Sequence, residues 1–406
     1  MPGQLLSKID SLKDDALELH TKLVSIPAIG PANNGKGEKD KADYLTSYLK
    51  EHGFDEVKSY NSPDDRVECG YRPNLVTIIP GQNSSKTLWI ISHMDVVPVG
   101  DLSLWNTDPF TLVQDGDAIY GRGTEDNHQG LVSSIIAARA LKECGVTPGC
   151  NVGLIFVSDE ETGSEHGLDF MLKEHENLFK KKDLFLVPDF GEPDSSMVEI
   201  SEKSTLWLKV TVEGKQCHAS TPEYGVNSLV AAAAMIVEIP ELHFQFDDQD
   251  ELFSPPFSTF VPTKKEANVE NVNTLPGKDV FYIDCRVLPT YDLEDVIEQV
   301  EGMGNYVAEE FGVKVTVEID NKHQAVPQTP VDAEIVEKTI FAIKEVYGVD
   351  ATPRGIGGGT VAAHLRERGY QAVVWSTLLN QAHQPNEKGS LSNTLGDAKV
   401  MVLLPF

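Results

Sequence analysis

The sequence predicts an α/β protein with a mostly parallel sheet in its main domain and a smaller α+β domain inserted into it. Over residues 1–203, short apolar runs alternate with helical stretches, as in a parallel sheet covered by helices. Over residues 204–320, apolar and polar residues alternate within the strands instead, which indicates strands with one solvated face. Residues 321–406 return to the first pattern and are expected to complete the main domain.

Hydrophobic periodicity places the elements of the main domain. Helices are expected where apolar residues recur at helical spacing, over residues 3–24, 38–52, 130–144 and 166–172. Strands are expected at the short apolar runs 75–79, 87–92, 152–158 and 184–187. After the insertion we expect helices over 332–346, 360–367 and 394–404 and a buried strand over 372–376.

The inserted domain is expected to follow a β-α-β-α-β order. Its strands are predicted at 205–213, 280–287 and 313–319, and its helices at 226–239 and 293–311. The run TLWLKVTVE at 205–213 alternates apolar and polar residues, as a half-exposed strand should, and the alternation is strict over 313–319.

Composition excludes several classes of function. The 406 residues include 63 acidic and 34 basic side chains, a formal net charge of −29, which argues against nucleic acid or an anionic membrane as a partner. We expect no signal peptide and no membrane span. The five cysteines are scattered without a Cys-x-x-Cys pair, so we expect a reducing cytoplasm rather than a disulfide framework or a thiolate metal site.

Polar residues that can bind metals follow the predicted strands. His93 and Asp95 end the strand at 87–92 and share one face of extended backbone, so Asp95 can fix the tautomer of a metal-binding His93. In an α/β sheet, this carboxyl edge is where ligands bind. Taken alone, a His-x-Asp pair is more often an ordinary hydrogen-bonded histidine.

The same arrangement recurs along the chain. Asp126 precedes the helix at 130–144, Glu160 and Glu161 follow the third strand, Asp189 follows the fourth, and His383 lies late in the chain. Any one of these acids could be a helix cap or a surface group. Together they offer imidazole and carboxylate ligands suited to Zn²⁺, with two ions possible if one carboxylate bridges them.

The sequence resembles a family of co-catalytic di-zinc peptidases and deacylases. This family includes carboxypeptidase G, aminoacylase, acetylornithine deacetylase, succinyl-diaminopimelate desuccinylase and several dipeptidases. The resemblance covers essentially the whole chain. It rests on the runs SHMDVVP at 92–98, Trp105 with DPF at 108–110, YGRG at 120–123 through Asp126, DEETG at 159–163 and AHQPNE at 382–387.

The resemblance implies a role for each of these residues. His93 and Asp189 would bind one zinc, Glu161 and His383 the other, and Asp126 would bridge them. Glu160 would be the general base and acid, and Asp95 would orient His93. The cofactors implied are two Zn²⁺, with Co²⁺ or Mn²⁺ as possible replacements.

The inserted domain would be the lid and dimerisation domain of this family. His218, in GKQCHASTP at 214–222, would stabilise the oxyanion across a homodimer. Asn273 and Arg286 would hold the substrate carboxylate, and Gly358, Gly359 and Thr360 would line the substrate pocket. From the residues alone, His218 is a surface turn residue and Arg286 is equally well a salt-bridge partner.

The chain departs from the family pattern at three places. Asn127-His128-Gln129 stands where lysine-glycine is usual, and we interpret His128 as a first-turn helix residue. Val361-Ala362 follows the glycines in place of a small polar residue. Asp189 stands where deacylases have glutamate and dipeptidases have aspartate, and Glu192 is an alternative ligand at this position.

Three functional hypotheses follow. The first is a di-zinc hydrolase that cleaves the amide bond of a small N-acyl amino acid, of the desuccinylase or deacetylase type, by water that the two ions activate. The second is a dipeptidase or exopeptidase that acts on short peptides by the same chemistry. The third is a non-catalytic binding paralogue, and the intact set of ligands counts against it.

Overall fold

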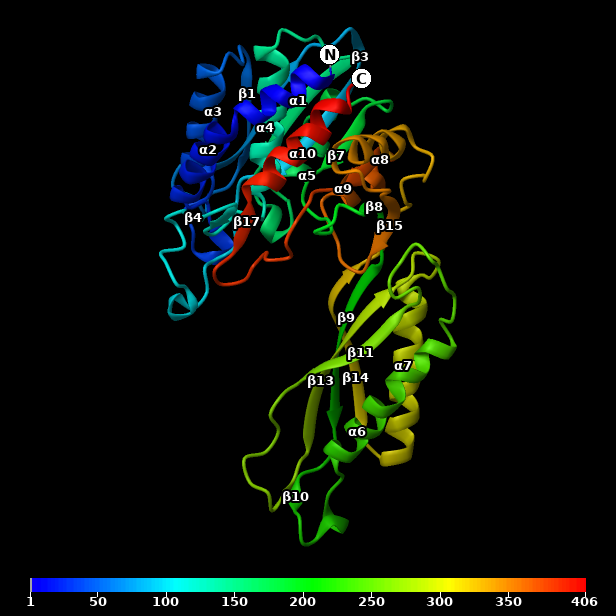
Figure 1. Ribbon diagram of the computed structural model, residues 1–406. Coiled ribbons are helices and arrows are strands. Elements are labelled where there is room, and N and C mark those ends of the chain that lie inside the picture. The colour runs from blue at the N-terminus through cyan, green and yellow to red at the C-terminus, as the bar shows by residue number, and fades with distance from the viewer. Residues whose placement is uncertain (1) are drawn as a thin grey trace. The chain divides into compact units, whose positions relative to one another are not determined.

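The computed structural model describes residues 2–406, which divide into two compact units (Figure 1). The first unit contains the residues up to Ile200 together with Gln328–Arg354 and Thr360–Phe406. The second contains Ser201–Pro327 and Gly355–Gly359. No helix formed by these described residues is both long and apolar enough to cross a membrane.

An eight-stranded sheet is the centre of the first unit. Its strands, in spatial order, are β1 (Val57–Pro63), β2 (Tyr71–Ile79), β6 (Cys150–Val157), β3 (Asn83–His93), β7 (Leu184–Val187), β16 (Gln371–Val374), β8 (Met197–Glu202) and β15 (Thr352–Ile356). The four strands β6, β3, β7 and β16 pair in parallel, whereas β1, β2 and β8 join them antiparallel. The predicted fold class is confirmed, with the parallel part at the centre of the sheet.

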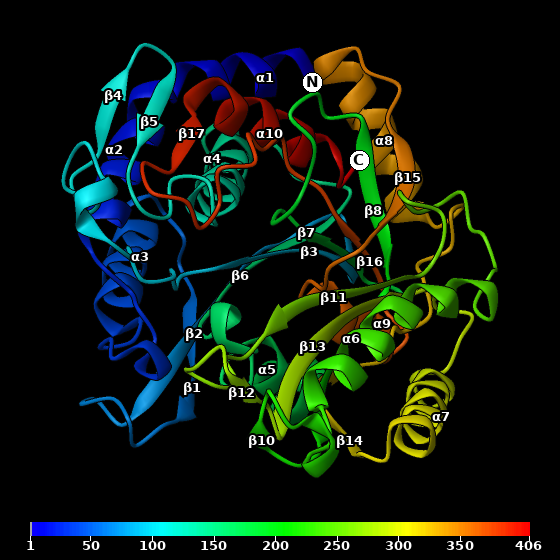
Figure 2. The same ribbon diagram turned by 90° about the horizontal axis from the view of Figure 1, so that it is seen from below.

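Helices cover both faces of this sheet (Figure 2). On one face, α4 (His128–Glu143) is buried along nearly its whole length, beneath α1 (Pro2–Ser11), α2 (Lys13–Ser25) and α10 (Leu391–Leu403). On the other face, α5 (Leu168–Glu174) and α9 (Ala362–Glu367) form a buried cluster with the side chains of β3 and β6 that point to this face. Two further helices, α3 (Lys39–Glu51) and α8 (Glu334–Tyr347), flank the sheet.

A small three-stranded sheet joins two distant parts of the chain. It consists of β4 (Val113–Asp115), β5 (Ala118–Tyr120) and β17 (Lys388–Ser390), and Lys388 pairs with Tyr120. The segments that follow Tyr120 and precede Lys388 carry Asp126 and His383. The sheet therefore brings these two segments together.

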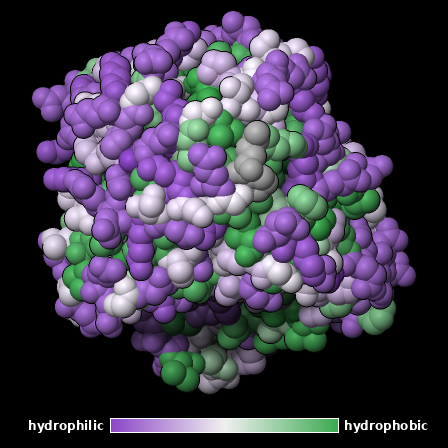
Figure 3. Space-filling view, turned by 45° about the horizontal axis from the view of Figure 1, so that its top comes forward, coloured by the Kyte–Doolittle hydropathy of each residue, from purple (hydrophilic) through white to green (hydrophobic). Residues whose placement is uncertain are grey.

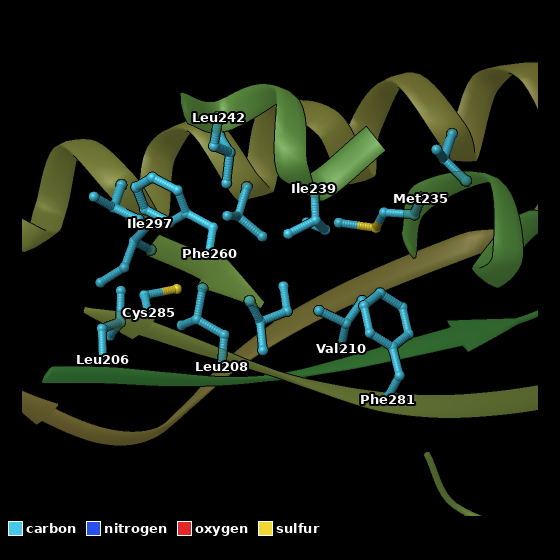
Figure 4. Close-up of a cluster of buried hydrophobic side chains, with 14 of the residues drawn as sticks. Leu206, Leu208, Val210, Met235, Ile239, Leu242, Phe260, Phe281, Cys285 and Ile297 are labelled. Carbon is cyan, nitrogen blue, oxygen red and sulfur yellow. The ribbon is translucent and has the colours of Figure 1, made fainter. Parts of the chain in front are cut away.

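The second unit is a four-stranded antiparallel sheet with two helices on one face. The strand order is β11 (Thr259–Lys265), β13 (Lys278–Val287), β9 (Ser204–Glu213) and β14 (Lys314–His323), and the helices are α6 (Ser228–Glu238) and α7 (Leu293–Phe311). Figure 4 shows Leu206, Leu208 and Val210 of β9 pointing toward these helices. The alternation that predicted a one-sided strand is therefore confirmed.

The structure differs from the predicted elements in its first helix and in several strands that were not predicted, among them β8 and β15 of the large sheet. The single helix expected over 3–24 is two helices, α1 and α2, which meet at Leu12. Strands β1 and β11 were not predicted because each contains a proline and few apolar residues. Both lie at an edge of their sheet, where proline is tolerated, and β11 has a register shift between Pro262 and Lys264.

Candidate metal centre

The predicted metal-binding residues of the first unit meet at the carboxyl edge of its parallel strands. Strands β3 and β6 end side by side, with His93 paired with Val157, and β7 runs parallel on the other side of β3. The residues that follow these strands therefore emerge as neighbours, as expected for an α/β sheet. Asp126 precedes α4, and His383 lies in the segment between β16 and β17.

Two groups of three side chains have the geometry to hold a metal ion. In the first, His93 Nε2 lies 2.9 Å from Asp126 Oδ1 and 3.4 Å from Asp189 Oδ1. In the second, His383 Nε2 lies 3.2 Å from Asp126 Oδ2 and 3.1 Å from Glu161 Oε2. Within each group the ligand atoms all lie within 4.8 Å of one another. Asp126 belongs to both groups and presents a different oxygen to each.

Asp95 supports both the first histidine and the loop beside it. His93 Nδ1 lies 3.0 Å from the carbonyl oxygen of Asp95 and 3.3 Å from its Oδ1. The Asp95 carboxylate also accepts the backbone N–H groups of Glu160, at 3.2 Å, and Glu161, at 3.0 Å. A proton on Nδ1 would leave the lone pair of Nε2 directed at the first group.

Glu160 lies beside the two groups without belonging to either. Its Oε2 is 3.9 Å from His93 Nε2. Burial raises the pKa of Glu160 well above its usual value, and the negative charge of Asp189 raises it further. A carboxyl group with a raised pKa next to a possible metal site is suited to accept and donate protons.

Burial and the neighbouring carboxylates also shift the pKa values of Glu161 and the two histidines. Burial raises the pKa of Glu161 to about 7. Hydrogen bonds to Asp126 and Glu161 raise the pKa of His383 to about 10. For His93, burial alone would lower the pKa, but the charge of Asp189 and hydrogen bonds to carboxylates raise it well above the usual value. These raised pKa values mean that this edge of the sheet favours bound protons, and hence bound positive charge.

The residues present fit two divalent cations. Their donors are imidazole nitrogens and carboxylate oxygens, without a thiolate, and this set suits Zn²⁺ and similar ions. Glu161 Oε1 is buried and has no hydrogen-bond partner within residues 2–406, as expected of an oxygen that a cation would satisfy. Asp189 belongs to the first group. Glu192, the alternative ligand at this position, belongs to neither group among the described residues.

A buried ion-pair network anchors the loop that carries Glu160 and Glu161. Arg72, on β2, is fully buried and donates from Nε to Glu38 at 2.6 Å and from Nη1 to Asp159 Oδ1 at 3.2 Å. Asp159 Oδ2 accepts the backbone N–H of His166 at 3.0 Å, which closes the loop. Arg72 and Glu38 were not predicted from the sequence, because neither follows the carboxyl end of a predicted strand.

Two buried glutamates clamp together the segments that carry Asp126 and His383. Glu387 accepts backbone N–H groups from Gly123 (2.8 Å), Glu125 (2.9 Å) and Asp126 (3.1 Å). In return, the carboxylate of Glu125 accepts the backbone N–H groups of Leu379 and Gln381.

The segment near His383 needs this support. The φ angle of His383 is 63°, a left-handed conformation that is unfavourable for a residue other than glycine. The clamp therefore holds Asp126, which both groups share, and the segment of His383, which belongs to the second group. In the sequence, Glu387 stands out only as part of the motif at 382–387, and Glu125 does not stand out at all.

Asn127, which follows Asp126 in the sequence, holds Asp189 by a side-chain hydrogen bond. Asn127 Nδ2 donates to Asp189 Oδ1 at 2.5 Å and to the carbonyl oxygen of Pro188 at 2.7 Å. His128 is the first residue of α4 and belongs to neither group, which agrees with its interpretation as a first-turn residue.

The remaining predicted residues lie in or next to the second unit. His218 and Asn273 are neighbours there, because His218 pairs with Thr274 in a two-stranded ribbon of β10 (Cys217–His218) and β12 (Thr274–Leu275). Arg286, on β13, donates to Asp284 at 2.8 and 3.0 Å and to the carbonyl oxygen of Gly357 at 2.9 Å. Gly358 and Gly359 belong to the second unit and Thr360 to the first.

Comparisons with known proteins identify the family. The model of peptidase family M20/M25/M40 matches residues 89–405. A metallohydrolase of Methanocaldococcus jannaschii is 42% identical, with 96% of this chain and 98% of the relative covered. A succinyl-diaminopimelate desuccinylase of Nitratiruptor is 25% identical, with 93% of this chain and 95% of the relative covered.

Solved structures agree on the fold. Aminopeptidase PepT from Bacillus cereus superimposes with a TM-score of 0.76 at 19% identity, with 97% of each chain covered. At this identity the likeness concerns the fold alone. The family match spans well over half of the chain and the M. jannaschii relative covers nearly all of it, so this protein is a metal-dependent hydrolase that belongs to peptidase family M20/M25/M40.

Proposed function

We propose that this protein is a di-zinc hydrolase that cleaves the amide bond of a small N-acyl amino acid. The observation that carries the proposal is the pair of ligand groups that share Asp126, with Glu160 beside them and part of neither. The desuccinylase relative supports this substrate class. Co²⁺ or Mn²⁺ could replace Zn²⁺, because the donor set contains nitrogen and oxygen only.

Each residue of the centre has a distinct proposed role. His93 and Asp189 would hold one ion, Glu161 and His383 the other, and Asp126 both. When bound, the two ions supply activation of water and polarisation of the amide carbonyl. Glu160 accepts a proton from the attacking water at its carboxylate and returns it to the departing amine. Asp95 acts indirectly, because it orients His93 and fixes the backbone of Glu160.

We assign substrate contacts to the second unit and the adjoining glycine segment. Asp284 holds the guanidinium of Arg286 by two hydrogen bonds, which fixes the orientation of its fork. The substrate carboxylate would be bound by Arg286 and Asn273. The rest of the substrate would contact Gly358, Gly359 and Thr360. A dipeptidase is the second candidate function, favoured by Asp189 in place of the glutamate typical of deacylases.

We also propose a homodimer in which His218 acts on the active site of the partner. His218 Nδ1 accepts the backbone N–H of Ser220 at 3.1 Å, so the proton of a neutral ring lies on Nε2, which can donate to an oxyanion. The outer face of α6 and the turn after it is apolar and exposed, and supplies a surface for a second copy. It includes Leu229, Val230, Val237 and Phe244, the last two being 75% and 73% exposed.

The setting of this reaction is expected to be the cytoplasm. All five cysteines are free thiols, which suits a reducing compartment. Hydrophilic side chains dominate the face shown in Figure 3, in keeping with the acidic composition. Neither nucleic acid nor a membrane surface is an expected partner.

The role of Glu160 predicts that Glu160→Gln lowers kcat by about 10²–10⁴-fold, because it removes the proton acceptor but no metal ligand. Zinc content, measured by atomic absorption, should remain that of the wild type. Glu165→Gln is the matched control, since Glu165 is an exposed acid on the same loop. Wild-type turnover in Glu160→Gln would contradict the assignment.

The cross-dimer role of His218 predicts complementation. His218→Ala alone should lose most turnover while it keeps its zinc. When His218→Ala and Glu160→Gln proteins are mixed and allowed to exchange subunits, one site in each mixed dimer has both intact residues. Activity should therefore reappear. If the mixture stays as inactive as its components while native mass spectrometry shows mixed dimers, His218 does not act across the interface.

The substrate class is tested by hydrolysis of a small panel with the zinc-loaded protein. The panel contains N-acetylornithine, N-succinyl-diaminopimelate and dipeptides with free or blocked amines. The proposal predicts turnover of the acyl amino acids, with kcat/KM reduced by Arg286→Gln. Turnover of free-amine dipeptides alone would instead establish the dipeptidase alternative.

A further inference from the structure

A buried lysine that the proposed reaction does not use lies next to the metal centre. Lys41, on α3, is 1% exposed, and its Nζ lies 2.7 Å from Nε2 of His128, which is also 1% exposed. An ammonium group loses much hydration energy on burial and is retained only where its charge or its hydrogen bonds are satisfied. The pair therefore needs an explanation beyond the filling of space.

Lys41 and His128 lie against the turn that leads to Asp126. The ring of His128 packs directly against Gly123, where an added Cβ would lie only 2.6 Å from His128 Cε1. The backbone N–H of His128 donates to the carbonyl oxygen of Gly123 at 2.9 Å. Lys41 thus holds a ring that supports the turn from Gly123 to the shared ligand Asp126.

Lys41 also interacts electrostatically with three buried carboxylates near the metal centre. Burial lowers the pKa of Lys41 to about 7, and the negative charges of Asp95, Glu38 and Glu387 oppose this change. Each of these three carboxylates contacts a different residue of the centre or its supports. The Asp95 carboxylate lies 3.3 Å from His93 Nδ1, Glu38 holds Arg72, and Glu387 holds the backbone of Asp126. A cation that interacts with all three offsets their mutual repulsion.

We propose that Lys41 is a positioning residue of the metal centre: its Nζ holds the ring of His128, which supports the turn to Asp126, and its protonated form offsets the negative charge of the surrounding carboxylates. This inference rests on the proposed function, because it takes the two ligand groups as metal sites. If Lys41 instead only fills space, a side chain of similar length without charge would replace it without effect on metal binding.

The test compares Lys41→Met with Lys50→Met, an exposed lysine on the same helix. Zn²⁺ affinity is measured by competition with a chelator, and the geometry of the loaded site by the visible absorption spectrum of the Co²⁺ form. We expect Lys41→Met to bind zinc about 10–100-fold more weakly, as for other residues that support metal ligands, and to show an altered Co²⁺ spectrum. Lys50→Met should match the wild type.

A charge-retaining variant tests the mechanism more closely. Lys41→Arg keeps a cation at this position and leaves the ring of His128 in place. We expect it to retain most of the zinc affinity that Lys41→Met loses. Wild-type affinity and spectrum in Lys41→Met, or a loss in Lys41→Arg as large as in Lys41→Met, would overturn the inference.

Two further outcomes are distinguishable. If Lys41→Met does not fold, as judged by circular dichroism of the metal-free protein, Lys41→Gln is measured by the same criteria. If the wild-type protein itself binds neither Zn²⁺ nor Co²⁺, the proposed function fails together with this inference. Wild-type metal binding with an unchanged Lys41 variant overturns the inference alone.

Discussion

The structure of the first unit depends on a buried concentration of negative charge at one edge of its sheet. Asp95, Asp126, Glu160, Glu161 and Asp189 gather around two histidines there. Carboxylates so close together repel one another unless protons or cations neutralise them. The raised pKa values of Glu160, Glu161 and His383 are the response of the protein alone, and a pair of divalent ions would relieve the same repulsion.

The surrounding structure holds these groups in place by contacts from distant parts of the chain. Arg72 anchors the loop of Glu160 and Glu161 through Asp159. Glu125 and Glu387 join the segments that carry Asp126 and His383. These contacts use backbone N–H groups or carboxylates that belong to neither group, so they leave the side-chain atoms of the two groups available. The fold thus preorganises the candidate ligands.

The sequence was sufficient to predict which residues gather at this edge of the sheet, but it was insufficient to predict the residues that support them. His93, Glu160, Glu161 and Asp189 were predictable because each follows an apolar strand, and parallel strands bring their carboxyl ends to one edge. Lys41, Arg72 and Glu387 follow no such rule. Their roles depend on side-chain contacts across 34 to 265 residues of sequence, which periodicity cannot reveal.

The same limit applies to the secondary structure. Long amphipathic elements such as α7 were predicted with their observed bounds, because their hydrophobic period is clear. The edge strands β1 and β11 were missed, because an edge strand needs little apolar surface and tolerates proline. Their pairing is decided by the neighbouring strand rather than by their own sequence.

The proposed mechanism requires two metal ions that share Asp126. Anomalous diffraction from crystals of the zinc-loaded protein would locate these ions. We expect two zinc peaks roughly 3.5–4 Å apart, as in other two-metal sites, one beside His93 and Asp189 and one beside Glu161 and His383. A single peak, or a second peak away from Asp126, would contradict it.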